Sequence, residues 1–98
     1  MSLIALDYDD TFTADPVFWR AFIELAQAGG HKVIIATLRE NNYGNPKEIN
    51  DALGVGHLVP IVFCNHRYKD EMCRKAGYTV DIWIDDMPEA VRERYTQT

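Results

Sequence analysis

Four short apolar segments recur along the chain, and each of them stops where polar or acidic residues begin. They cover residues 3–6, 32–36, 58–63 and 80–84. An almost continuously apolar segment, with no alternation, is typical of a strand covered on both faces. Pro60 has no backbone donor, so we expect it near the start of the third strand or on the sheet edge. The pattern therefore predicts four strands.

The segments between these strands carry the signals of helices. Asp15 and Pro16 supply an N-cap and a first-turn proline, and apolar residues then recur at helical spacing up to Gly29. The stripe that we expect to face the core consists of Phe18, Phe22, Leu25 and Ala26. Three further helices are predicted, at about 46–54, 67–76 and 87–95.

Strands that alternate with helices call for parallel pairing through right-handed crossovers. The sequence therefore predicts an α/β fold, a three-layer α/β/α sandwich around a parallel, Rossmann-like sheet of about four strands. With 98 residues and no internal repeat or linker, we expect one domain over residues 1–98.

Composition narrows the classes of function. Hydrophobic residues make up 47% of the chain, which is too high for disorder. A net charge of −5 argues against a broad nucleic-acid interface, because such interfaces are basic. There is no apolar run of the roughly 18 residues that a membrane span needs, and no signal-peptide pattern, so we expect a cytoplasmic protein that does not enter membranes. Cys64 and Cys73 lack the spacing of a zinc site and are expected to be buried free thiols.

Polar residues follow all four predicted strands. The C-terminal ends of parallel strands meet at one edge of the sheet, where open α/β folds bind ligands. The residues expected at that edge are Asp7, Asp9, Thr37, Lys69, Asp85 and Asp86. Side chains two apart on an extended strand leave on the same face, so Asp7 and Asp9 should reach one bound group. Carboxylates gathered around one point repel unless a hard cation lies among them, and Mg²⁺ prefers such oxygen ligands.

These residues resemble the four motifs of the haloacid dehalogenase superfamily, most of whose members are Mg²⁺-dependent phosphotransferases. DYDDT at residues 7–11 resembles the DxDxT signature, and VIIAT ending in Thr37 is similar to the second motif. Lys69 occupies the place of the third motif's lysine, and WIDD at 83–86 resembles the fourth motif. The motifs appear in the family's order, and the resemblance covers essentially the whole chain.

The resemblance implies a mechanism. Asp7 would be the nucleophile that becomes an aspartyl phosphate, and Asp9 the general acid and base. Mg²⁺ would be held by Asp7, the backbone carbonyl of Asp9, and the acidic pair Asp85-Asp86. Thr37 and Lys69 would bind the transferring phosphoryl group.

Several assignments stay open on the sequence. Either Asp85 binds the metal directly while Asp86 binds a metal-bound water or orients Lys69, or the order is reversed. Arg39 is either a substrate clamp or an ordinary surface cation. Asp10 is expected to be an exposed turn acid.

Other polar residues receive secondary assignments. Thr11 is expected to bond to the backbone of its turn. Lys75 is the fallback for Lys69 and should otherwise lie on the surface. His31 and His57 are expected on the surface away from the site, and His66 is expected to face solvent near the mouth of the site.

The spacing leaves no room for the cap domain that many members of this superfamily insert. Only six residues separate Asp9 from Pro16, and five separate Phe63 from Lys69. An open rim suits a phosphorylated macromolecule, whereas a neighbouring copy of the chain could close the site over a small molecule. The loop at 39–45 is expected to contact the substrate. The sequence thus predicts a Mg²⁺-dependent phosphatase, and the alternative is a non-catalytic or receiver-like binding module that retains the acidic pocket.

Overall fold

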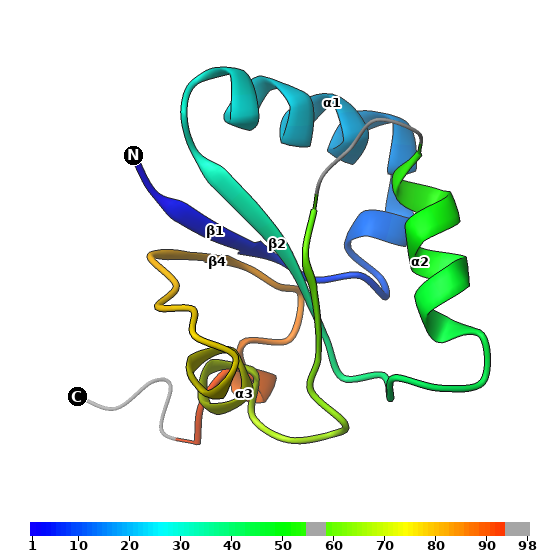
Figure 1. The fold of residues 1–98 in the computed structure, drawn as a ribbon, viewed down its shortest axis with the longest axis vertical. Coiled ribbons are helices and arrows are strands. Elements are labelled where there is room, and N and C mark those ends of the chain that lie inside the picture. Colours follow the sequence, from blue (N-terminus) through cyan, green and yellow to red (C-terminus); the bar gives the residue numbers. More distant parts are fainter. Residues whose placement is uncertain (55–58, 94–98) are drawn as a thin grey trace.

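Strands and helices alternate along the computed structural model, which describes residues 1–54 and 59–93 (Figure 1). The strands are β1 (Leu3–Leu6), β2 (Lys32–Thr37), β3 (Ile61–Phe63) and β4 (Ile82–Ile84). The helices are α1 (Pro16–Ala28), α2 (Asn45–Leu53) and α3 (Lys69–Lys75), with short 3-10 turns η1 (Phe12–Ala14) and η2 (Pro88–Ala90). All four predicted strands are present.

The four strands form one parallel sheet in the order β3-β2-β1-β4. The chain runs outward from β1 through β2 to β3 and then returns to β4 on the other side of β1. Leu6 at the end of β1 is paired with Ile35 on one side and with Ile84 on the other. The predicted α/β fold with a four-stranded parallel sheet is therefore confirmed, and the C-terminal strand ends share one edge.

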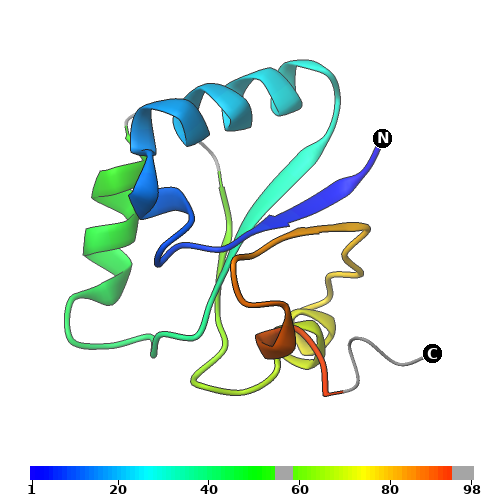
Figure 2. The ribbon, with the colours of Figure 1, turned by 180° about the vertical axis from the view of Figure 1, so that it is seen from behind.

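Helices pack against both faces of this sheet, α1 and α2 on one face and α3 on the other (Figures 1 and 2). Alternate residues of each central strand point to opposite faces, which produces two hydrophobic clusters. Leu6 and Ile35 join the cluster with α1 and α2, whereas Ala5 and Ile34 join the cluster with α3. None of the helices in the described ranges is long and apolar enough to span a membrane.

Helix α1 begins as the sequence predicts, but its buried face differs. The Asp15 side chain accepts a hydrogen bond from the backbone N–H of Phe18 at 3.2 Å, and Pro16 is the first helical residue. Phe18 and Leu25 are exposed, so their assignment to the core is wrong. The face that packs on the sheet consists of Trp19, Phe22, Ile23 and Ala26. Both sets of residues have helical spacing, so the period alone does not choose between them, and the observed apolar stripe is rotated by about one residue from the predicted one.

Several elements are shorter than predicted. Strand β3 begins at Ile61, because Pro60 cannot donate to the ladder, although its carbonyl still accepts from the Ile35 N–H at 2.9 Å. As expected for a strand that follows proline, β3 lies at the sheet edge. Helix α3 begins at Lys69, two residues after the predicted start, and β4 begins at Ile82. Residue 58, part of the predicted third strand, lies outside the described residues.

The predicted last helix is wrong over its described part. Only Pro88–Ala90 forms a single 3-10 turn, and residues 91–93 are not helical. Val91 is buried, and its carbonyl accepts from the backbone N–H of Asp70 at 2.9 Å. This contact ties the chain at Val91 to the start of α3. The remainder of the prediction, residues 94 and 95, lies outside the described residues.

Leu6 and Leu25 provide a matched test of this packing. Leu6 is fully buried beside the site, whereas Leu25 is 75% exposed. Leu6→Ala should lower the free energy of unfolding by about 2 to 5 kcal/mol, because it leaves a cavity in the core. Leu25→Ala should change it by less than about 0.5 kcal/mol. Urea unfolding followed by circular dichroism measures both values, and equal losses would contradict the assigned burial.

Candidate active site

The register of the two central strands places the first and last acidic motifs side by side. Leu6 is paired with Ile84, so Asp7 and Asp85 follow directly on neighbouring strands. The backbone N–H of Asp7 continues the ladder by donating to the Ile84 carbonyl at 2.9 Å. Although 78 residues apart in the chain, the two aspartates therefore leave the sheet together.

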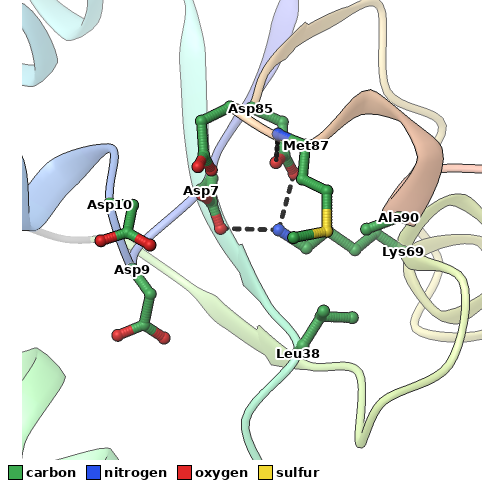
Figure 3. Close-up of a pocket in the computed structure, with 9 residues that line it drawn as sticks. Asp7, Asp9, Asp10, Leu38, Lys69, Asp85, Met87 and Ala90 are labelled. Carbon is green, nitrogen blue, oxygen red and sulfur yellow. Dashed lines mark hydrogen bonds and ion pairs between the residues drawn. The ribbon is translucent and has the colours of Figure 1, made fainter.

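Lys69 joins these two carboxylates. Its ammonium nitrogen lies 2.6 Å from Asp7 Oδ1 and 2.6 Å from Asp85 Oδ2 (Figure 3). Lys69 is 1% exposed, so this is a buried ion triad and not a surface contact. Lys69 is also the first residue of α3, where the helix dipole disfavours a cation, and the two carboxylates offset that effect.

Thr11 and Asp86 complete the surroundings of Asp7. The Thr11 hydroxyl donates to Asp7 Oδ2 at 3.0 Å and also lies 3.4 Å from Asp86 Oδ1. The expectation that Thr11 bonds to the backbone is therefore wrong for its side chain, which holds carboxylates instead. Asp7 thus has one oxygen fixed by Lys69 and the other by Thr11. The carboxylate is oriented before any ligand arrives.

The two acids after β4, Asp85 and Asp86, differ in how firmly hydrogen bonds hold their side chains. Asp85 Oδ2 is held by Lys69, and Asp85 Oδ1 accepts from the backbone N–H of Met87 at 2.9 Å. Asp86 is exposed, and its Oδ1 lies at the long distance of 3.4 Å from the Thr11 hydroxyl. The residue that orients Lys69 is therefore Asp85. For the contact with Lys69, this agrees with the reversed order that the sequence left open.

Negative charge is in excess at this point. Oxygens of Asp7, Asp85 and Asp86, one from each residue, lie within 4.8 Å of one another, and these residues could hold a metal ion. Burial raises the pKa of Asp7 from 3.8 to about 6; the Lys69 hydrogen bond opposes this rise, and Asp86 adds to it. The same two partners, Asp7 and Asp85, raise the pKa of Lys69 even though burial acts to lower it. One lysine does not neutralise three carboxylates.

A small pocket opens onto these groups. It has a volume of about 90 Å³. Its walls are formed by Asp7, Asp9, Asp10, Leu38, Lys69, Asp85, Asp86, Met87 and Ala90. Asp10 is exposed and has a left-handed backbone (φ 64°), as suits a turn acid. In Figure 3, Asp9 and Asp10 lie on one side of Asp7 and Lys69 lies on the other.

Asp9 does not share the contacts of Asp7. The chain turns after Asp7 rather than staying extended, and the Asp9 side chain is directed to Arg39. Arg39 Nη2 donates to Asp9 Oδ1 at 2.8 Å and Arg39 Nε donates to Asp9 Oδ2 at 3.0 Å. The side chain of Asp9 is absent from the three-carboxylate cluster, although it lines the same pocket. The two predicted roles of Arg39 both miss this intramolecular ion pair.

Side chains of α2 hold Arg39 in its position beside Asp9. Arg39 Nη1 donates to Glu48 Oε1 at 2.8 Å and to Asn45 Oδ1 at 3.0 Å. The guanidinium lies 5.1 Å from the ring centre of Tyr8, whose hydroxyl donates to Glu48 Oε2 at 3.2 Å. Sequence reasoning missed Glu48 and Tyr8. The only sequence signal for Glu48 is an acidic residue in the first turn of the helix that follows the arginine-containing loop. Acidic residues are common at that helical position, so this signal does not single out Glu48.

Two other residues from the sequence analysis, Thr37 and Lys75, do not line the acidic pocket. Thr37 is buried at the end of β2, and its hydroxyl accepts from the backbone N–H of Arg39 at 3.2 Å. It is not among the residues that line the acidic pocket, so its contact with a phosphoryl group stays a prediction. Lys75 pairs with Glu71 on the exposed side of α3, which confirms it as a surface residue.

The predicted burial of the histidines and cysteines is confirmed for most of those that the structure describes. His66 is exposed, as expected. His31 is half-buried and its Nδ1 accepts from the backbone N–H of Ser2 at 3.0 Å, so it is not a free surface residue. His57 lies outside the described residues. Cys64 and Cys73 are buried free thiols, as predicted.

Comparison of the chain with family models, with curated proteins and with solved structures finds no match in any of the three. The interpretation of the site therefore rests on its geometry and on its four motifs.

The raised pKa of Asp7 predicts a dependence of stability on pH that Asp7→Asn should remove. A carboxyl whose folded pKa is about 6, against 3.8, favours the fold below pH 4, and this contribution is lost as pH rises through 6. In EDTA, the free energy of unfolding of Asp7→Asn relative to the wild type should rise by about 2 to 3 kcal/mol from pH 4 to pH 7. Urea unfolding at four pH values measures this change.

Asp51→Asn is the matched control, because Asp51 is exposed on α2 and pairs with the equally exposed Lys47. Its stability relative to the wild type should stay within about 0.5 kcal/mol across the same range. If the difference in free energy of unfolding between Asp7→Asn and the wild type did not change with pH, the fold would not raise the pKa of Asp7.

Proposed function

We propose that this protein is a Mg²⁺-dependent phosphomonoester hydrolase with a three-layer α/β/α sandwich of the haloacid dehalogenase type, lacking a cap domain. The observation that carries the proposal is the buried Lys69, which bridges Asp7 and Asp85 at 2.6 Å beside the freer Asp86. The proposed nucleophilic carboxylate, a cation and further acids converge on one small pocket, and they come from three of the four motifs.

The donor set fits a hard divalent cation. Asp7, Asp85 and Asp86 offer carboxylate oxygens within 4.8 Å of one another, which is the chemistry that Mg²⁺ prefers. Three ionised carboxylates and one ammonium leave two negative charges, which a divalent ion balances. Asp7 and Asp86 would be its direct side-chain ligands, because Asp7 Oδ2 and Asp86 Oδ1 contact the neutral Thr11 hydroxyl, whereas the Asp85 oxygens accept from the Lys69 ammonium and from the Met87 backbone N–H. Bound there, Mg²⁺ would reduce repulsion between the phosphate and the anionic nucleophile.

The protein's own groups would carry the bond changes. An oxygen of Asp7 attacks phosphorus while the bond from phosphorus to the leaving oxygen breaks, which yields an aspartyl phosphate. Lys69 keeps Asp7 ionised and oriented, and its charge attracts the phosphoryl oxygens. Water then attacks the same phosphorus, which releases inorganic phosphate and restores the Asp7 carboxylate.

We assign the proton transfers to Asp9. It lines the mouth of the pocket and would donate a proton to the leaving oxygen in the first step and accept one from water in the second. Both of its oxygens accept from Arg39 in this structure, so one of these contacts has to break before Asp9 can donate a proton. The same ion pair is the one observation that favours the alternative, a binding module that no longer catalyses.

Hydrolysis of p-nitrophenyl phosphate and of a panel of phosphomonoesters, with Mg²⁺ or with EDTA, tests the proposal. The wild type should be active only with the metal. Asp7→Asn should abolish turnover, and Asp9→Asn should lower kcat by about 10²- to 10⁴-fold. Lys69→Met should lower it by about 10²-fold or more.

Lys47→Met and Asp51→Asn are matched controls, because both residues are exposed on α2. Their kcat values should stay within about twofold of the wild type. A folded wild type that is inert on the whole panel with Mg²⁺ would favour the binding module over the hydrolase.

A further inference from the structure

A second, larger pocket adjoins the acidic one. It has a volume of about 450 Å³, within the range of small-molecule sites. Its walls are Leu38, His66, Arg67, Tyr68, Glu71 and Ala90. Leu38 and Ala90 also line the acidic pocket, so the two pockets share a wall.

The second pocket is built onto the catalytic segments. Leu38 follows Thr37 directly, and Tyr68 directly precedes Lys69. The backbone N–H of His66 donates to the Leu38 carbonyl at 2.9 Å, which ties the β3–α3 loop to the end of β2. A group bound in this pocket therefore has a fixed position relative to the phosphate-binding lysine.

The loop that presents these side chains has an unusual backbone. Asn65 and His66 both have left-handed φ angles, 54° and 61°, which are uncommon for residues other than glycine. Such strain costs on the order of 1 kcal/mol or more per residue and tends to gather at ligand sites. The turn brings three consecutive residues, His66, Arg67 and Tyr68, to one wall of the pocket.

The acidic pocket cannot hold a whole substrate. Its volume of about 90 Å³ is roughly the share of three water molecules, which suits a phosphoryl group. The organic part must lie outside it. The adjoining pocket offers the space, and it lacks the concentration of acids that surrounds Asp7.

We propose that the second pocket binds the leaving group of the substrate and that this group carries a nucleobase, so that the substrate is a nucleoside monophosphate. Imidazole, guanidinium and phenol groups are the side chains on which bases stack, and His66, Arg67 and Tyr68 supply all three. Glu71 can accept a hydrogen bond from an exocyclic amine. The inference rests on the proposed hydrolase.

A single nucleotide fits better than a longer strand. Strand binding draws on a groove of basic residues along the phosphate backbone. The whole chain has a net charge of −5, and the pocket wall combines Arg67 with the acidic Glu71. The second pocket can therefore stack one base, but its lining offers no row of basic residues that would bind further phosphates.

Kinetics on two substrates test the assignment. The ratio of kcat/KM for adenosine 5′-monophosphate to kcat/KM for glycerol 3-phosphate should fall about tenfold in Tyr68→Ala and in Arg67→Ala. Phe18→Ala and Lys47→Ala remove an exposed aromatic and an exposed cation elsewhere, and the ratio should not change in them. An unchanged ratio in all four variants would overturn the assignment. An end-phosphorylated oligonucleotide that is preferred over the mononucleotide would also overturn it.

A binding measurement separates this inference from the proposed hydrolase. Adenosine, which has no phosphate, is titrated into the wild type in EDTA and followed by amide chemical shifts. Shifts at residues 38, 66–68 and 90 that disappear in Tyr68→Ala support the pocket even if the protein proves inert. No shift there, in a protein that hydrolyses phosphomonoesters, overturns the pocket and leaves the hydrolase standing.

Discussion

The buried ammonium of Lys69 between two carboxylates is the interaction on which the rest of this structure depends. Removing a lysine and two acids from water costs several kcal/mol per ion, and only close pairing within the triad offsets that cost. Asp7 and Asp85 come from neighbouring strands, and Lys69 comes from α3, which packs on one sheet face. The triad therefore ties the register of β1 with β4 to the position of α3.

The same triad leaves the site short of positive charge, which links its stability to its chemistry. One lysine compensates three clustered acids only in part, and burial keeps the pKa of Asp7 near 6. A folded protein without metal thus holds unfavourable charge at Asp7, the proposed nucleophile. A divalent ion would balance that charge and complete the proposed site. Functional sites commonly gather buried, like-charged groups in this way, because the perturbed groups are the ones that react.

The sequence predicts the backbone of this arrangement well, because it depends on local patterns. Apolar segments that end in polar residues mark the strands, and parallel pairing then brings Asp7, Lys69 and Asp85 to one edge. Contacts that depend on side-chain direction could not be predicted. The ion pair of Asp9 with Arg39 arises because the chain turns after β1, and the support from Glu48 depends on where α2 packs. The early end of the last helix likewise accompanies a long-range contact, that of Val91 with α3.

The most direct test of the account is a Mn²⁺ titration followed by electron paramagnetic resonance, with Mn²⁺ standing in for Mg²⁺ at an oxygen site. We expect one tight ion per chain, an affinity about tenfold or more weaker in Asp86→Asn, and no change in Asp51→Asn, which removes an exposed carboxylate on α2. Equal Mn²⁺ affinity in the wild type and in Asp86→Asn, or no bound ion in the wild type, would show that the three carboxylates do not form a metal site.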